Sequence, residues 1–312
     1  MEKSVLITGA SGFVGASLTR RLLKENYKIH VITRDNTDLW RLGGILEDIE
    51  IHNLSLLNSE KIAKLASDIS VDKIYHLATY GGYHYQNKVE DVINTNVIGT
   101  FNLFREFSRK GIEMFVNTSS SSEYGEKTQP MSEEMNVAPN NMYGASKAAG
   151  TILCSTYAKI NKIPLVTLRL FSPYGYYDAK TRLIPTVITS CLIGNEIKLS
   201  RKDSVRDFIF IDDVMEAYLA ASKRVNSHGE IFNVGSGTQY TIEEIVSTVK
   251  NLIGKDVKID WEENLNRQYE PLMWVSDNKS AYEKLNWKPN VEIRDGLNNT
   301  INWFKDNLKF YR

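Results

Sequence analysis

Apolar positions in the first half of the chain alternate between two periods. Short runs rich in β-branched residues predict strands, and between them apolar residues recur at helical spacing, as at Val14, Leu18 and Leu22. This alternation predicts an α/β fold built on a doubly wound parallel sheet, the Rossmann fold. The predicted strands are residues 4–8, 28–33, 49–52, 73–77, 114–117, 165–168 and 231–235, and the predicted helices are residues 13–25, 58–67, 90–109 and 144–161.

The pattern changes after Pro173 and Gly175, where short runs mix with prolines and basic residues. Further on, Thr241 and Glu244 form the pattern of a capping box at a helix start, in a segment rich in predicted helix. We therefore expect two units. They are a Rossmann domain of residues 1–170 plus 207–235, and a smaller C-terminal α/β lobe of residues 171–206 and 236–312.

Composition narrows the classes of partner. The chain has 312 residues, 42% of them hydrophobic, and zero net charge, which argues against nucleic acid or an anionic membrane as partner. No apolar run approaches the roughly 20 residues that span a bilayer. A strand follows the first residues directly, so we expect no signal peptide and a cytoplasmic protein. Cys154 and Cys191 lack metal-ligand spacing and are expected to be reduced and buried.

Three glycines lie between the first predicted strand and the first predicted helix. Gly9 allows a tight turn, Gly12 lets the backbone approach a pyrophosphate, and Gly15 lets helix and strand pack closely. The free N–H groups at the helix start then face the phosphates. The spacing is GxxGxxG rather than GxGxxG, but its strand–turn–helix setting predicts a site for a dinucleotide.

The end of the second strand leaves the choice between NAD and NADP open. A carboxylate there would bind the ribose 2′-hydroxyl of NAD, yet the position falls on Thr33, followed by Arg34 and Asp35. Arg34 would neutralise the 2′-phosphate of NADP, lie over the adenine, or remain a surface arginine. Asp35 would reach the ribose if the strand ended one or two residues later.

A tyrosine and a lysine four residues apart, Tyr143 and Lys147, follow a serine cluster at residues 119–122. Their spacing places them on one helix face. A free tyrosine, with a pKa near 10, is a poor base at neutral pH, and we expect the nearby ammonium to lower that pKa. With a serine hydroxyl donating to the substrate oxygen, the motifs predict hydride transfer at a carbon that carries a hydroxyl or keto group.

Together these motifs resemble extended short-chain dehydrogenases/reductases of the nucleotide-sugar epimerase/dehydratase type, over nearly the whole chain. The matching segments are residues 8–15, 76–78, 96–100, 118–125, 143–147, 206–209, 212–214, 233–235 and 285–289, with Arg267, Asp277 and Lys279.

The resemblance implies catalytic roles for Ser120, Tyr143 and Lys147, because Ser120 lies four residues before the tyrosine of the Tyr124-Gly125 pair. It implies that Arg206 and Arg267 bind the substrate's diphosphate, which suits bidentate guanidinium groups; surface salt bridges are the alternative. The implied cofactor-binding residues are Gly9, Ser11, Gly12, Phe13, Val14, Gly15, Arg34, Asn53, Leu54, Leu77, Ala78, Thr79, Asn96 and Lys147. The implied substrate-binding residues are Tyr80, Gly81, Ser121, Ser122, Ser172, Arg206 and Arg267.

The chain departs from the family pattern at three places. Sugar 4,6-dehydratases carry an Asp-Glu pair directly after the catalytic Ser or Thr, where this chain has Ser121 and Ser122. Glu123 comes one position late and, in a strand-like stretch, would face away, so we argue against a dehydratase. Ser172 replaces the usual asparagine near the sugar or phosphate, and Asn53 replaces the usual aspartate near the adenine.

The loop of residues 79–86 follows the fourth strand, at the carboxyl edge of the sheet beside the cofactor. Its glycines and aromatic rings suit sugar docking, although rings that simply pack against the small lobe explain the pattern equally well. We assign no catalytic role to His84.

We therefore expect an enzyme that oxidises or reduces C4 of a nucleotide-linked sugar with NAD or NADP, in synthesis of surface-polysaccharide sugars. Ser120 and Tyr143 would bracket the C4 oxygen. A 4-dehydrogenase and a 4-ketoreductase are slightly preferred over a 4-epimerase, because Thr33, Arg34 and Ser172 depart from the common epimerase pattern. A protein that only senses a dinucleotide is the remoter alternative. The resemblance also implies a homodimer paired through helices near residues 90–109 and 144–161.

Overall fold

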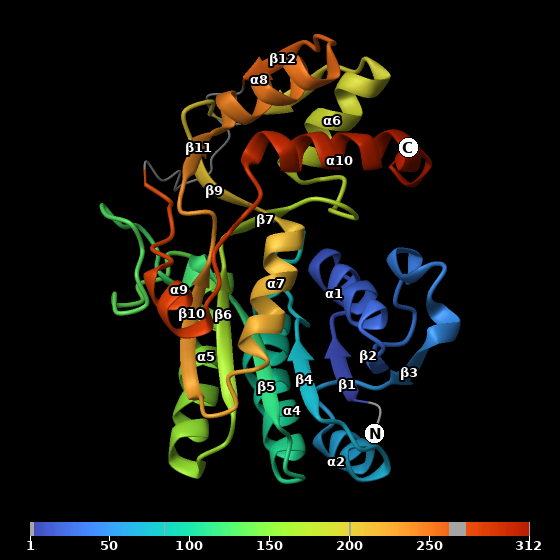
Figure 1. Ribbon diagram of the computed structural model, residues 1–312, viewed down its shortest axis with the longest axis vertical. Helices are drawn as coiled ribbons and strands as arrows, with labels where there is room; N and C mark the ends of the chain where they lie inside the picture. Colours follow the sequence, from blue (N-terminus) through green and yellow to red (C-terminus); the bar gives the residue numbers. More distant parts are fainter. Residues whose placement is uncertain (1–2, 84, 200, 262–272, 312) are drawn as a thin grey trace.

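The computed structural model describes residues 3–83, 85–199, 201–261 and 273–311. At its centre lies a seven-stranded sheet in the order β10-β6-β5-β4-β1-β2-β3, with every pair of neighbours parallel (Figure 1). The predicted fold class is confirmed. The strands are β1 (Ser4–Thr8), β2 (Lys28–Thr33), β3 (Ile49–Asn53), β4 (Lys73–His76), β5 (Met114–Ser120), β6 (Leu165–Leu170) and β10 (His228–Val234).

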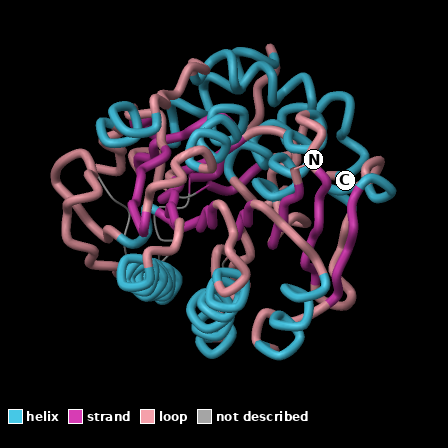
Figure 2. Tube along the Cα trace, turned by 60° about the horizontal axis from the view of Figure 1, so that its bottom comes forward, coloured by secondary structure: helices cyan, strands magenta, loops and turns pink. Residues whose placement is uncertain are grey.

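Helices cover both faces of this sheet (Figure 2). On one face α2 (Ser59–Asp68), α4 (Thr100–Ser108) and α5 (Met142–Asn161) pack side by side, and on the other α1 (Phe13–Lys24) packs against α7 (Ile211–Ala221). The side chains of β1 divide between these faces as strand periodicity requires. Val5 and Ile7 join the apolar cluster of α1 and α7, whereas Leu6 joins that of α2, α4 and α5.

The helix predicted at residues 90–109 is divided into three parts. It starts as α3 (Val89–Ile93), widens into the π-helical segment η3 (Asn94–Gly99), and continues as α4. A π-helical turn inside a helix is uncommon and frequently marks a functional site. Here it presents Asn96 to the loop that follows β4, as described below.

Most of the remaining elements build a smaller lobe at one end of the large sheet (Figure 1). Its predicted capping box is confirmed, since Thr241 and Glu244 each accept a hydrogen bond from the other's backbone N–H. Strand β9 crosses the predicted boundary at residue 206 and lies in the small sheet, and the division into domains stays a prediction. The lobe contains the sheet β11-β9-β7 (Gln239–Thr241, Val205–Phe210, Ser172–Tyr174), the pair β12-β8 (Ile259–Trp261, Ile197–Leu199), and helices α6 (Leu183–Ile193), α8 (Ile242–Ile253) and α10 (Ile293–Asn307). Helix α9 (Lys279–Leu285) instead packs against β10 of the large sheet and against α7.

Two further expectations concern the protein's environment. Cys154 and Cys191 are both buried and unpaired, as predicted. Within the described ranges, no helix combines the length and the apolar character needed to cross a bilayer.

Candidate active site

The glycine turn lies at the carboxyl end of β1, where the strand order reverses between β1 and β4. Gly9 has φ of +74°, and a Cβ there would lie 2.6 Å from the amide nitrogen of Ala78. A Cβ on Gly15 would lie 2.1 Å from the carbonyl oxygen of Gly9. Helix α1 starts at Phe13 with no side-chain cap from Gly12 and no acidic residue in its first turn. The turn is therefore a cradle of backbone N–H groups that fits a phosphate.

A buried hydrogen-bonded chain fixes the end of β4 beside this turn. The hydroxyl of Thr8, which accepts from the N–H of Ala78 at 3.2 Å, donates to Nδ1 of His76 at 2.7 Å. Nε2 of His76 donates to the hydroxyl of Thr100 at 2.9 Å, which in turn donates to the carbonyl of Asn96. Burial lowers the pKa of His76 to about 3, so the ring is neutral and acts as a structural link. It positions Leu77 and Ala78, both predicted to contact the cofactor.

The side chain of Asn96 organises the loop after β4. Its Oδ1 accepts from the hydroxyl of Thr79 at 3.0 Å and from the N–H of Tyr80 at 2.9 Å. Its Nδ2 donates to the carbonyl of Tyr80 at 2.7 Å and to the hydroxyl of Ser146 at 2.8 Å. These four bonds use both N–H groups of Nδ2 and two acceptor positions of Oδ1, so the Asn96 side chain positions Thr79 and Tyr80.

Helix α5 brings Tyr143 to the carboxyl end of β5. Asn141 caps this helix by accepting from the N–H of Gly144 at 2.8 Å. A Cβ on Gly144 would lie 2.3 Å from the carbonyl oxygen of Ser122, so only glycine lets the helix approach the serine segment this closely. The hydroxyl groups of Ser120 and Thr79 lie close to the Tyr143 phenol and favour its ionised form. The structure therefore brings the predicted pair Ser120 and Tyr143 together and adds Thr79 to it.

Lys147 lies one turn further along α5 and is 5% exposed. Its Nζ donates to the carbonyl of Thr118 at 2.6 Å. Burial lowers the pKa of this ammonium to about 8, against the opposing charge of Glu123. The pKa of Tyr143 is raised, because burial of the phenol outweighs the favourable effect of the neighbouring Ser120 and Thr79 hydroxyls. The net direction in this structure is therefore upward, and a lowering of the Tyr143 pKa by Lys147 stays a prediction.

Glu123 does not lie in a strand-like stretch as predicted, because β5 ends at Ser120 and Ser121–Glu123 form a 3-10 turn. Its carboxylate is fully buried and accepts from Nε of Arg169 at 2.7 Å, from the hydroxyl of Thr151 at 2.7 Å and from that of Ser119. These bonds direct it away from the catalytic pair, so the expectation that Glu123 faces away holds for a different reason.

Two of the predicted substrate residues, Ser121 and Arg206, lie next to Trp274. Trp274 links Ser121 to Arg206, since its Nε1 donates to the Ser121 hydroxyl at 3.2 Å and its ring lies 5.9 Å from the Arg206 guanidinium carbon. Ser172 starts β7, which pairs with β9 near Arg206. Arg267 lies outside the described residues.

The loop after β4 contacts both α5 and the small lobe. Gly81 has φ of +95°, and a Cβ there would lie 3.5 Å from the Tyr143 ring, so this position adjoins Tyr143. Tyr83 and Tyr85 stack on each other with centroids 5.4 Å apart. Burial raises the pKa of Tyr83, with Asp178 and Arg182 of the small lobe among its charged neighbours. His84 lies outside the described residues.

The ends of β2 and β3 form the predicted adenine side. Thr33 and Asn53 are paired in register, and the Thr33 hydroxyl donates to Oδ1 of Asn53 at 2.5 Å. The N–H of Leu54 donates to the carbonyl of Thr33 at 3.0 Å. Arg34 and Asp35 follow, and both are exposed. Their burial therefore does not decide between NAD and NADP.

Two arginines near the site escaped the sequence interpretation. Arg182 precedes α6 and acts electrostatically on Tyr143, while Arg41 donates to the carbonyls of Tyr177 at 2.7 Å and Ser11 at 3.4 Å. Arg41 thus ties the glycine turn to the small lobe. The mixture of prolines and basic residues after Pro173 was the only signal for Arg182, and no motif marked Arg41.

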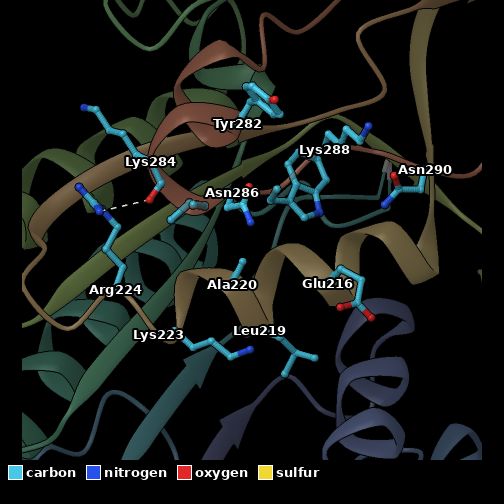
Figure 3. Close-up of a pocket in the computed structure, with 12 residues that line it drawn as sticks. Glu216, Leu219, Ala220, Lys223, Arg224, Tyr282, Lys284, Asn286, Lys288 and Asn290 are labelled. Atoms are coloured by element: carbon cyan, nitrogen blue, oxygen red, sulfur yellow. Dashed lines mark hydrogen bonds between the residues drawn. The ribbon is translucent and has the colours of Figure 1, made fainter.

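A groove of about 750 Å³ lies away from these residues, between α7 and the segment 282–290 (Figure 3). Lys223, Arg224, Lys284 and Lys288 line it together with Glu216. None of the predicted site residues within the described ranges lines this groove, so we assign it no part in the chemistry predicted from the sequence.

Comparison with known proteins agrees with this geometry. Residues 5–235 match the model of the NAD dependent epimerase/dehydratase family. The chain is 27% identical to a UDP-glucuronate 4-epimerase of Thermodesulfobacterium geofontis, over 98% of both chains. It is also 27% identical to a dTDP-4-dehydro-6-deoxyglucose reductase of Escherichia coli, over 96% of this chain and 97% of the other.

A solved structure gives the same picture. The UDP-glucuronic acid 4-epimerase of Bacillus cereus, in complex with UDP-glucuronic acid and NAD, superposes with a TM-score of 0.87 at 28% identity. The match covers 97% of this chain and 99% of that one.

Proposed function

The chain belongs to the NAD-dependent epimerase/dehydratase family, and we propose that it oxidises or reduces C4 of a nucleotide-linked sugar with a nicotinamide cofactor. The observation that carries this proposal is the position of Ser120 beside the Tyr143 phenol, with Lys147 one helical turn away on the same helix. A proton acceptor, a hydroxyl donor and a buried ammonium at one strand end suit an alcohol or ketone carbon and little else.

NAD is the cofactor that we propose. The cradle at Gly9, Gly12 and Gly15 would hold its pyrophosphate, Leu77, Ala78 and Thr79 would line its middle, and Lys147 would hold the nicotinamide ribose. Bound NAD would supply the hydride acceptor at C4. The relatives named above support NAD over NADP, since the Bacillus cereus enzyme binds NAD, and the exposed Arg34 is then not needed for a 2′-phosphate.

Proton transfer at the C4 oxygen would belong to the chain's own residues. Ser120 donates a hydrogen bond to this oxygen, and Tyr143 takes its proton during oxidation and returns it during reduction. Because burial raises the pKa of Tyr143, the phenol is neutral in the free protein and needs positive charge nearby to act as a base. The ammonium of Lys147, held on the Thr118 carbonyl, is the chain's own source of that charge.

Arg206 and Arg267 would bind the diphosphate, and Tyr80, Gly81, Ser121, Ser122 and Ser172 would surround the sugar. The position of Arg206 beside Trp274 and Ser121 supports a path from diphosphate to sugar. UDP-sugars are the first substrates to test, because UDP-glucuronate is named for relatives that match over nearly their full length. The sugar product would serve surface-polysaccharide synthesis.

A 4-epimerase is the second candidate, and the full-length match to UDP-glucuronate 4-epimerases favours it. An epimerase oxidises C4, lets the keto sugar turn, and reduces it on the other face. The reductase relative favours net reduction in equal measure. A 4,6-dehydratase is disfavoured because Ser121 and Ser122 offer no carboxylate, and Glu123 is committed to Arg169.

The test is a panel of UDP-, GDP-, dTDP- and CDP-sugars, each with NAD and with NADP. Absorbance of the reduced nicotinamide follows net redox, and NMR identifies the sugar product. A stoichiometric change in reduced cofactor establishes a dehydrogenase or reductase, and a new C4 epimer with no net change establishes an epimerase. Turnover of none of these sugars with either cofactor would overturn the proposal.

We further propose a cytoplasmic homodimer. Exposed apolar residues gather on the helices expected to pair: Val89, Ile93 and Ile98 on one, Ile152 and Ile160 on the other. Sedimentation should show a dimer that Ile152→Glu converts to a monomer. The control is Ile193→Glu, on an exposed apolar residue of α6. A wild-type monomer would contradict the proposal.

A further inference from the structure

Three side chains with metal-ligating atoms converge on the two strands at the far edge of the sheet. His30 lies on β2, and Glu50 and His52 lie two residues apart on β3 and so point to the same face. The strands are in register with His30 opposite Glu50. One ligand atom from each of the three residues lies within 4.8 Å of the others. We propose that His30, Glu50 and His52 bind a divalent transition-metal ion such as Zn²⁺, at a site separate from the catalytic residues.

The distances suit such an ion. Nδ1 of His30 lies 3.0 Å from Nε2 of His52 and 3.2 Å from Oε2 of Glu50. In a tetrahedral zinc site with bonds of about 2.0–2.1 Å, neighbouring ligand atoms are about 3.3 Å apart. The two nitrogens therefore need to separate by only a few tenths of an ångström to admit the ion between them. Two imidazoles and one carboxylate are also the ligand types that zinc, nickel and cobalt accept.

The exposed edge of the sheet gives an ion access to this site and leaves room for a water molecule as a further ligand. β3 is the last strand of the sheet, and Glu50 is 52% exposed, whereas His30 is 3% exposed. The site thus has a buried anchor on β2 and an open side on β3, where water would complete the coordination. At pH 7.5 an ordinary histidine is mostly neutral, so both imidazole lone pairs are available.

Lys28 is the natural competitor of the metal. Its Nζ lies 2.8 Å from Oε1 of Glu50, while Oε2 of the same carboxylate faces His30. Without an ion, the lysine and the His30–His52 hydrogen bond satisfy the cluster by themselves. Because the Lys28 ammonium and the metal compete for the Glu50 carboxylate, removal of the Lys28 charge should strengthen metal binding.

The bound ion would join β2 to β3 next to the predicted adenine site. His52 precedes Asn53, whose side chain accepts from Thr33 across the same pair of strands. The ion acts there as a cross-strand link and takes no part in hydride transfer.

The experiment uses the full-length protein, stripped with EDTA and dialysed at pH 7.5, and titrated with Co²⁺ in the visible range. We expect one equivalent of Co²⁺ to give the intense d–d bands of a four-coordinate site, and Zn²⁺ to displace them. His52→Gln and Glu50→Gln should each weaken Co²⁺ binding at least tenfold. Lys28→Gln should strengthen Co²⁺ binding.

The matched control is His228→Gln, a histidine of β10 outside the cluster, which should bind like the wild type. Circular dichroism shows whether each variant is folded. A wild type without the four-coordinate Co²⁺ spectrum, or a folded Glu50→Gln and His52→Gln that bind Co²⁺ as well as the wild type, would overturn the proposal.

Discussion

Arg169 donates from Nε to Oε2 of Glu123 over 2.7 Å, and both side chains are buried. The guanidinium also donates to the hydroxyl of Tyr124 at 2.9 Å and lies over its ring. The pair joins β6 to the 3-10 turn that follows Ser120. Buried pairs of this kind contribute less to stability than their contact suggests, but removing one partner leaves a buried charge unpaired.

Glu123→Gln should therefore destabilise the fold by about 3 kcal/mol or more, as judged by urea unfolding at pH 7.5. It should also lower the pKa of Lys147 further, because Glu123 is the main charge that raises it. If activity needs the charged ammonium, the fall in activity on the alkaline side of the pH profile should begin at a lower pH in this variant than in the wild type. Glu126→Gln, the same exchange at an exposed position three residues on, is the control. Equal unfolding free energies of the two variants would show that the Glu123–Arg169 pair does not stabilise the fold.

A second prediction concerns the pH dependence of stability. Burial lowers the pKa of Lys147 from 10.5 to about 8, so between these values the unfolded chain holds a proton that the folded protein has released. The cost of burying the ammonium is fully present below pH 8, and stability rises as pH passes through this window. Relative to Lys147→Met, the wild type should gain roughly 2–3 kcal/mol in unfolding free energy between pH 7 and pH 10. A difference between the two proteins that does not change with pH would show that Lys147 keeps an ordinary pKa.

Arg206→Met should raise KM for the nucleotide sugar about 10- to 100-fold with a much smaller change in kcat, since a charge-assisted hydrogen bond contributes about 1.5–3 kcal/mol. KM should change more than kcat because Arg206 would bind the diphosphate equally strongly in the ground state and in the transition state. Arg201→Met removes an exposed arginine from the segment that leads into β9 and should leave KM unchanged. A kcat loss as large as the KM change would place Arg206 at the reacting carbon instead.

The local features of this protein are readable from its sequence. Strand and helix periods follow from burial of one face, and the glycines at positions 9 and 15 follow from backbone sterics that no other residue satisfies. The spacing of Tyr143 and Lys147 places both on one helix face for the same local reason.

Contacts between distant segments are not readable in this way. Trp274 reaches Ser121 across 153 positions, and Arg169 reaches Glu123 across 46. The direction of the Tyr143 pKa depends on how deeply the assembled fold buries the phenol. No spacing rule gives the depth at which a side chain is buried, so Arg182 and Trp274 were identified near the site only from the structure.

The central claim is that Tyr143 moves the proton at the C4 oxygen. The most direct test compares Tyr143→Phe with the wild type, on the nucleotide sugar that the panel identifies, with cofactor affinity measured on the same samples. The account predicts a fall in kcat of about 10²- to 10⁴-fold, the usual contribution of a general acid–base group, with NAD affinity changed less than about threefold. A variant that keeps its kcat and binds NAD normally would contradict it.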